Sequence, residues 1–161
     1  MNKIYNILLI MSYKISKNFT YEEMYASPTA KARLIDNTPN DEVKSNLYKL
    51  VTTILQPIRD EFGEPIIVTS GYRCPKLNTA IGGAINSMHK QGKAADIKAK
   101  NMKKLQDCVL EWAKTNNFDQ IIIEKPINGV ASWLHIGSYY SDNRQRKQIL
   151  VYDGKYYRKY K

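Results

Sequence analysis

The chain has 161 residues, of which 43% are hydrophobic and 25% charged, and its mean hydropathy is −0.50. This composition excludes a fully disordered chain and a collagen-like repeat, and no apolar run reaches the roughly 18 residues that cross a bilayer. The 25 lysines and arginines exceed the 15 acidic residues, so the net charge is +10. Such a charge favours an anionic partner: nucleic acid, a membrane surface or a cell-wall polymer. Two cysteines are too few for a disulfide framework or a four-cysteine zinc site.

The first eleven residues, MNKIYNILLIM, hold one early lysine and a short apolar run. The run is shorter than the apolar region of a secretory signal, and no small-residue cleavage site follows it. Three interpretations remain: a weak export signal, a membrane-proximal segment, or a start codon set too early, with Met11 as the true start. We prefer the last, and we expect residues 12–161 to form a single domain.

Two long helices and one short helix are predicted. The sequence Thr20-Tyr21-Glu22-Glu23 is a capping box and starts the short helix. Thr38, as N-cap before Pro39, is predicted to open a long helix that ends at Gly63 and is kinked by Pro57. Asn101 is predicted to cap the second long helix. Their apolar positions have helical spacing: Val43, Leu47, Leu50, Ile54, Ile58 and Phe62 in the first, and Met102, Leu105, Val109 and Trp112 in the second.

The remaining apolar segments are short and predict strands. Residues 65–69 are predicted to form a buried strand, and Ala94 to Ile97 a second one. Residues 120–124 and 133–136 are predicted to pair about a turn at Asn128-Gly129, and a final hairpin over 148–160 turns at Asp153-Gly154. These elements predict an α+β domain with a small, mainly antiparallel sheet and flanking helices.

The last 21 residues hold seven lysines and arginines against two aspartates. One interpretation is that lysines protect the edge strand of the final hairpin from pairing with another chain. The other is that this basic, tyrosine-rich segment contacts an anionic polymer, with tyrosines stacking on sugars or bases. Both can hold together.

The chain contains two histidines, His89 and His135, each near small residues and a predicted strand. Zinc binds imidazole nitrogen and carboxylate oxygen, and a catalytic zinc ion keeps three protein ligands and one position for water. Asp96 lies on a predicted strand, and the small residue Gly92 would let the His89 loop fold back over it. His89, Asp96 and His135 are therefore a candidate ligand set. From these residues alone, a structural His–Asp pair is the more common alternative.

The spacing Ser87-x-His89-x-x-Gly92-x-Ala94-x-Asp96 resembles the signature of the zinc D-Ala-D-Ala carboxypeptidase family. That family also includes vancomycin-resistance dipeptidases and phage L-alanyl-D-glutamate endolysins, and it is related to the hedgehog signalling domain. Three further segments are similar to the same family: residues 70–73 (SGYR), 118–120 (FDQ) and 133–136 (WLHI). The resemblance extends from about residue 18 to residue 137.

The resemblance implies a hedgehog-like fold and a single Zn²⁺ ion held by His89, Asp96 and His135. The ion would polarise a peptide carbonyl and activate water. Arg73 would stabilise the developing oxyanion or bind a substrate carboxylate, although a surface salt bridge is its alternative. Three further residues are expected to contact the substrate or to orient these groups: Ser87, Tyr72 and Trp133.

The general base is where the sequence departs from the family. Several members carry an acid three residues before the final histidine ligand, and here that position is Ser132. If residues 121–124 and 133–136 pair as a hairpin, Glu124 lies opposite Trp133 and on the same face as His135. Glu124 is therefore the predicted base, with Asp119 as the reserve candidate. An ion pair of Glu124 with a lysine is the alternative.

The favoured function is a monomeric zinc metallopeptidase that hydrolyses peptidoglycan stem peptides or cross-links. It would be a D,D-carboxypeptidase or endopeptidase, or an L-Ala–D-Glu endolysin. It would act at the bacterial cell wall or periplasm, either phage-encoded and released or exported. The alternative is a zinc-containing wall-binding module with little hydrolytic activity. A nucleic-acid binder is disfavoured because no groove-reading motif accompanies the charge. Neither Cys74 nor Cys108 has a partner ligand at zinc-finger spacing, and a disulfide between them is left open.

Overall fold

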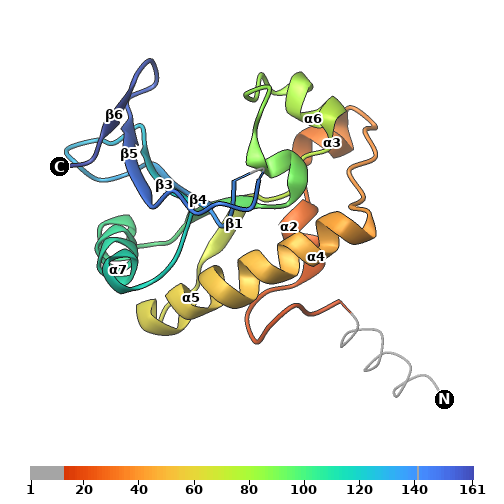
Figure 1. Cartoon of the computed structure of the whole chain (residues 1–161). Coiled ribbons are helices and arrows are strands. Elements are labelled where there is room, and N and C mark those ends of the chain that lie inside the picture. The colour runs from red at the N-terminus through yellow and green to blue at the C-terminus, as the bar shows by residue number, and fades with distance from the viewer. Residues whose placement is uncertain (1–12, 141) are drawn as a thin grey trace.

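Figure 1 shows the computed structural model, which describes residues 13–140 and 142–161. The interpretations of residues 1–11 therefore lie outside the described residues. The helices are α2 (Tyr21–Tyr25), α3 (Pro28–Ala32), α4 (Asp41–Leu50), the π-helical turn η1 (Val51–Leu55), α5 (Gln56–Phe62), α6 (Pro75–Ala80), the 3₁₀ turn η2 (Met88–Gln91) and α7 (Met102–Thr115). The strands are β1 (Ile67–Ser70), β2 (Ala94–Lys98), β3 (Gln120–Glu124), β4 (Trp133–Gly137), β5 (Gln148–Tyr152) and β6 (Tyr157–Lys159). The predicted α+β class is confirmed.

One six-stranded sheet organises the chain, in the order β1-β2-β4-β3-β5-β6. The β3–β4 hairpin has the predicted register, with Glu124 opposite Trp133 and Ile122 opposite His135. The β5–β6 hairpin is also confirmed. The β3–β5 pairing is parallel, while the other four pairings among the described strands are antiparallel. The sheet is therefore mainly antiparallel, as expected.

The α4–η1–α5 rod and α7 cover one face of the sheet, as Figure 1 shows. Alternate residues of each central strand point into the core formed there, because successive side chains of a strand lie on opposite faces. The strand residues in this core include Ala95, Ile97, Ile121, Ile123, Leu134 and Ile136, all exposed by 2% or less. The other face of the same strands carries Asp96, Glu124 and His135.

Three details of the predicted elements are corrected. The N-cap of α4 is Asn40, whose side chain accepts from the Val43 N–H, so Thr38 is not the cap. The predicted single helix is interrupted before Pro57 by the π-helical turn η1, so it consists of α4, η1 and α5. The strand predicted over 65–69 is β1, which begins two residues later and ends one residue later; it lies at the sheet edge and is half exposed rather than buried.

Other local predictions are confirmed. Thr20 and Glu23 form the predicted capping box of α2. Gly63 ends α5 with a φ of 75°, in the left-handed region that favours glycine. Asn101 caps α7 by accepting from the Lys104 N–H. No helix within residues 13–140 and 142–161 combines the length and apolar character needed to cross a membrane.

Candidate metal centre

Three side chains converge on the open face of the sheet. Asp96 lies in the middle of β2, directly opposite His135 on the neighbouring strand β4. His89 comes from η2, which folds back over β2 and ends at Gly92 with a φ of 66°. A Cβ at Gly92 would come within 2.9 Å of the Val43 side chain and carbonyl, so a larger residue would push this turn away from α4. The turn therefore depends on glycine at this position.

Backbone contacts orient His89. Its Nδ1 lies 2.7 Å from the Gly71 carbonyl oxygen, which can only accept, so Nδ1 carries the proton and Nε2 faces the cluster. The Gly71 backbone is itself held close to Met24, where a Cβ would lie 2.1 Å from the Met24 carbonyl oxygen. Glycine is thus required at the contact that orients the imidazole, because even the Cβ of alanine would clash.

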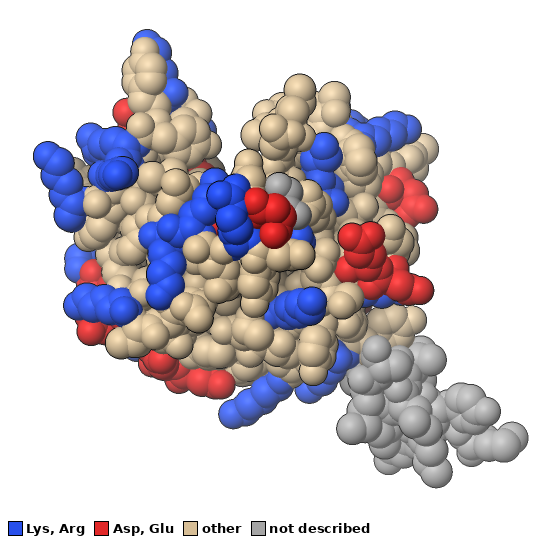
Figure 2. Space-filling model, in the orientation of Figure 1, with Lys and Arg blue, Asp and Glu red and all other residues tan. Residues whose placement is uncertain are grey.

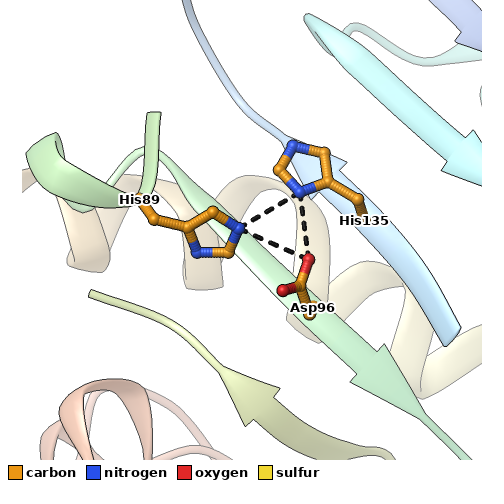
Figure 3. Close-up of side chains that lie close together, drawn as sticks. All are labelled: His89, Asp96 and His135. Carbon is orange, nitrogen blue, oxygen red and sulfur yellow. Dashed lines mark hydrogen bonds and ion pairs between the residues drawn. The ribbon is translucent and has the colours of Figure 1, made fainter. Parts of the chain in front are cut away.

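The spacing of the cluster fits a tetrahedral metal site (Figure 3). His89 Nε2 lies 3.2 Å from His135 Nδ1 and 3.3 Å from Asp96 Oδ1, and His135 Nδ1 lies 3.0 Å from the same oxygen. Zinc bonds of about 2.0–2.1 Å at tetrahedral angles separate ligand atoms by about 3.3 Å. Two imidazole nitrogens at 3.2 Å also need a cation or a proton between their lone pairs. The residues therefore fit a metal ion with two nitrogen ligands and one oxygen ligand.

The electrostatics favour the protonation states that bind a metal. Burial lowers the pKa of His89, whose side chain is 2% exposed, so the imidazole is neutral at pH 7. Burial alone would raise the pKa of Asp96, but the two adjacent imidazoles reverse this, and the pKa lies well below its ordinary value. Both groups are then deprotonated at their ligand atoms, as metal binding requires.

The three residues line a cavity of about 360 Å³, which we call the metal cavity. Figure 2 shows the hollow that separates the β5–β6 hairpin from the part of the molecule that carries α6. Four of the five other residues singled out from the sequence also line it: Arg73, Ser87, Glu124 and Trp133. The structure thus brings together residues from four separate stretches of the chain.

Glu124 lies on the same face of the sheet as His135, one diagonal step away across β3 and β4. It is 9% exposed, and burial raises the pKa of its carboxyl above the ordinary value, although His135 nearby opposes this. A buried carboxylate with a raised pKa beside metal ligands is the usual setting of a general base. Ser132 donates its hydroxyl to the Lys125 carbonyl at 2.7 Å, and it is not among the residues that line the cavity.

Arg73 is held between the motif loop and the cluster. Its backbone N–H donates to the His89 carbonyl at 3.1 Å. Burial lowers the pKa of its guanidinium, which Asp96 partly offsets. Its buried Nε has no hydrogen-bond partner among the described residues. An unsatisfied buried donor is costly, and Arg73 is a residue that lines the metal cavity.

Tyr72 is placed differently from the other candidates. Its residue is 9% exposed and packs in the core, and it is not among the residues that line the metal cavity. It lines an adjoining cavity of about 320 Å³, which shares Arg73, Asp96 and Trp133 with the metal cavity. Tyr72 therefore lies outside the metal cavity, and its predicted role towards the substrate stays a prediction.

The reserve base, Asp119, is not available for proton transfer. It is fully buried, and both of its carboxylate oxygens accept hydrogen bonds from the Arg146 guanidinium. Because an ion pair of this kind holds the carboxylate in place, Asp119 is a structural residue. Cys74 and Cys108 are both free thiols, so the structure contains no disulfide between them.

The sequence did not predict that three residues after β4 line the metal cavity: Tyr140, Arg146 and Tyr157. The sequence predicts this C-terminal segment only as an edge hairpin or as a contact for an anionic polymer. Only the parallel pairing of β5 with β3 brings this segment alongside the open face. The excess of tyrosine and arginine after residue 138 was the one available signal.

The fold and the site define a metal-dependent peptidase: a small α+β domain with a two-histidine, one-aspartate cluster in an open cavity beside an arginine and a buried glutamate. The family model described as Peptidase M15 matches residues 17–137. The match covers most of the chain, and the chain belongs to the peptidase M15 family. The resemblance inferred from residues 18–137 is thereby confirmed. A search of curated proteins gave no match.

Proposed function

We propose that the protein is a zinc peptidase that hydrolyses peptide bonds in the stem peptides or cross-links of peptidoglycan. The carrying observation is the metal cavity, which combines a three-ligand cluster, a buried carboxylate and an unpartnered arginine donor within one open site. Three protein ligands leave one position for water, as in catalytic rather than structural zinc sites. The likeness of the His89–Asp96 loop to D-Ala-D-Ala carboxypeptidases supports a peptidoglycan substrate.

Each residue has a role in this proposal. Zinc, when bound by His89, Asp96 and His135, supplies a Lewis acid that polarises the carbonyl and makes water more acidic. Glu124 accepts the proton of the attacking water and later returns it to the leaving amine. Arg73 donates from Nε to the oxygen that becomes negative in the tetrahedral transition state.

The basic surface supports the choice of an anionic wall as the place of action. The chain carries a net charge of +10, and Figure 2 shows lysine and arginine side chains across the face below the hollow. Such a charge raises the local concentration of an acidic polymer. We propose that the protein acts as a monomer at the bacterial cell wall, either released as a phage-encoded lysin or exported to the wall.

A digest of purified peptidoglycan, with and without a chelator and analysed by mass spectrometry, tests the proposal. Chelator-sensitive products are expected, and their masses identify the bond. Free D-Ala indicates a carboxypeptidase, split cross-links a D,D-endopeptidase, and bare glycan with released stems an L-Ala–D-Glu endolysin. The matched control is Glu124→Gln, which should retain zinc and lose hydrolysis.

The alternative function, a wall-binding module, rested on the missing acid at position 132. It is not favoured, because Glu124 places another carboxylate in the same cavity. Unchanged peptidoglycan, after incubation with protein shown to contain zinc, would overturn the peptidase proposal and support the binding module.

A further inference from the structure

The segment after the family match forms one end of the metal cavity. Arg146 and Tyr140 line it near Gln120, at the start of β3, whereas Glu124 and Trp133 lie at the other end of the β3–β4 hairpin. The cluster lies between these ends, because His135 pairs with Ile122, midway along β3. A substrate bound at the cluster therefore extends towards Arg146 in one direction.

Arg146 is held in a fixed position. Its Nε and Nη2 donate to the two carboxylate oxygens of Asp119 at 2.8 and 2.6 Å, and its backbone N–H donates to Asp119 Oδ1 at 3.0 Å. Its Cζ lies 4.1 Å from the centroid of the Tyr140 ring, within stacking distance. Asp119 is fully buried, so it fixes the guanidinium from behind. An arginine held in this way loses little further freedom when it binds a ligand.

The Arg146 guanidinium has a further donor besides those that bind Asp119. Nη1 has no hydrogen-bond partner among the described residues, and 27% of the side chain is exposed. The acidic residues that line the metal cavity are Asp96, a member of the metal cluster, and Glu124, at the opposite end. Asp119 offsets the charge of Arg146 from behind through Nε and Nη2, and Asp142 is a second carboxylate among the charges that act on it. Neither of these carboxylates lines the metal cavity, so Nη1 is the donor that Arg146 has left for a ligand. A carboxylate is the ligand that this geometry and charge favour.

We propose that Arg146 is a specificity-determining residue that binds a carboxylate of the substrate at this end of the metal cavity. This inference rests on the proposed function. Gln120 lies two residues along β3 from Ile122, which corresponds to about 7 Å. Because Arg146 is held by Asp119, which directly precedes Gln120, we expect the bound carboxylate to belong to a substrate residue near the scissile bond. The substrate class is an acidic stem peptide, and a carboxamide at that position makes it a poor substrate.

Three synthetic stem peptides test the proposal: one with free carboxylates, one amidated at the α-carboxylate of its glutamyl residue, and one amidated at its C-terminus. Binding by titration calorimetry and kcat/KM are measured on the zinc-loaded protein and three variants. The variants are Arg146→Gln, Arg146→Lys and Arg144→Gln. Arg146→Lys keeps a positive charge beside Asp119 but loses the paired N–H donors of the guanidinium. Arg144 is the matched control, because it is exposed, pairs with Asp142 on the same segment and does not line the cavity.

The unmodified protein is expected to bind one amidated peptide roughly 10- to 100-fold more weakly than the free acid, as for a lost charged hydrogen bond. The amide that matters identifies the carboxylate. Arg146→Gln and Arg146→Lys should remove this discrimination, and Arg144→Gln should keep it. Thermal melting identifies any variant that fails to fold. If Arg146→Gln fails to fold, the proposal is tested with Arg146→Lys.

Equal discrimination by the unmodified protein and a folded Arg146 variant would overturn the proposal. So would an equal loss for all three peptides, which would indicate a purely structural role for the Arg146–Asp119 pair. The proposed function fails separately, if no peptide is hydrolysed. In that event, the binding measurements still decide whether Arg146 recognises a carboxylate.

Discussion

The two faces of the central strands carry different tasks. On the face covered by α4, α5 and α7, residues such as Ile123 and Leu134 are buried and apolar. On the other face, the adjacent residues Glu124 and His135 line an open cavity. Neighbours in sequence are thus separated by the sheet. The stability of the fold and the chemistry of the site therefore depend on alternate residues of the same strands.

The largest expected effect is the loss of hydrolysis when the metal is removed from the open face. Treatment with a chelator should lower hydrolysis at least about 1,000-fold, because the Lewis acid contributes several kcal/mol to the barrier. Re-addition of zinc should restore it, and thermal melting should show a lower melting temperature without metal, since the ion binds only the folded state. Full hydrolysis by protein shown to be free of metal would contradict the assignment of the cluster.

Substitution of Glu124 separates chemistry from metal binding. Glu124→Gln should lower kcat by roughly 10²- to 10⁴-fold, because the proton acceptor is lost, while zinc content and melting temperature stay close to those of the unmodified protein. Steady-state kinetics and metal analysis check both. Glu111→Gln is the matched control, since Glu111 is exposed on α7 and pairs with Lys114. Hydrolysis unchanged in Glu124→Gln would show that another group is the base.

A substitution on the covered face of the sheet should lower stability and leave kcat almost unchanged. Leu134 is fully buried in β4, next to His135 in sequence. Leu134→Ala should lower the free energy of unfolding by about 2–5 kcal/mol through lost burial and the cavity that remains. Denaturant unfolding measures this, and kcat per folded molecule at low temperature should stay within a few-fold. A large loss of kcat without loss of stability would break the division between the faces.

The smallest expected effect is a shift in the pH dependence of kcat. The acid limb of the kcat profile follows Glu124, which must be deprotonated to act, so activity falls as pH drops through its pKa. Burial raises this pKa, and Lys125 is among the charges that lower it. Lys125→Gln should therefore shift the acid limb to higher pH. A bound divalent cation also lowers the pKa, so both proteins are compared at equal zinc content. A shift to lower pH would show that Glu124 does not set this limb.

Local chemistry made much of the fold predictable. Capping by Thr20 and Asn101 and the stop at Gly63 depend on side chains within a few residues of each helix end. The β3–β4 register followed from one turn, and it correctly predicted that Glu124 lies opposite Trp133. The predictions of Thr38 as the N-cap of α4 and of a buried strand over 65–69 were wrong, because the choice among competing polar caps and the burial of a strand depend on what packs nearby.

The sequence by itself determined the family, the class of fold and the candidate ligands, because the His89–Asp96 spacing and the periodicity of the elements are local properties of the chain. Tertiary structure alone decided which residues meet at the cavity. The parallel pairing of β5 with β3 brings Arg146 and Tyr157 to the open face, and it removes Asp119 as a base by pairing it with Arg146. These contacts join residues far apart in the chain, and their energy depends on packing and burial that no local pattern records.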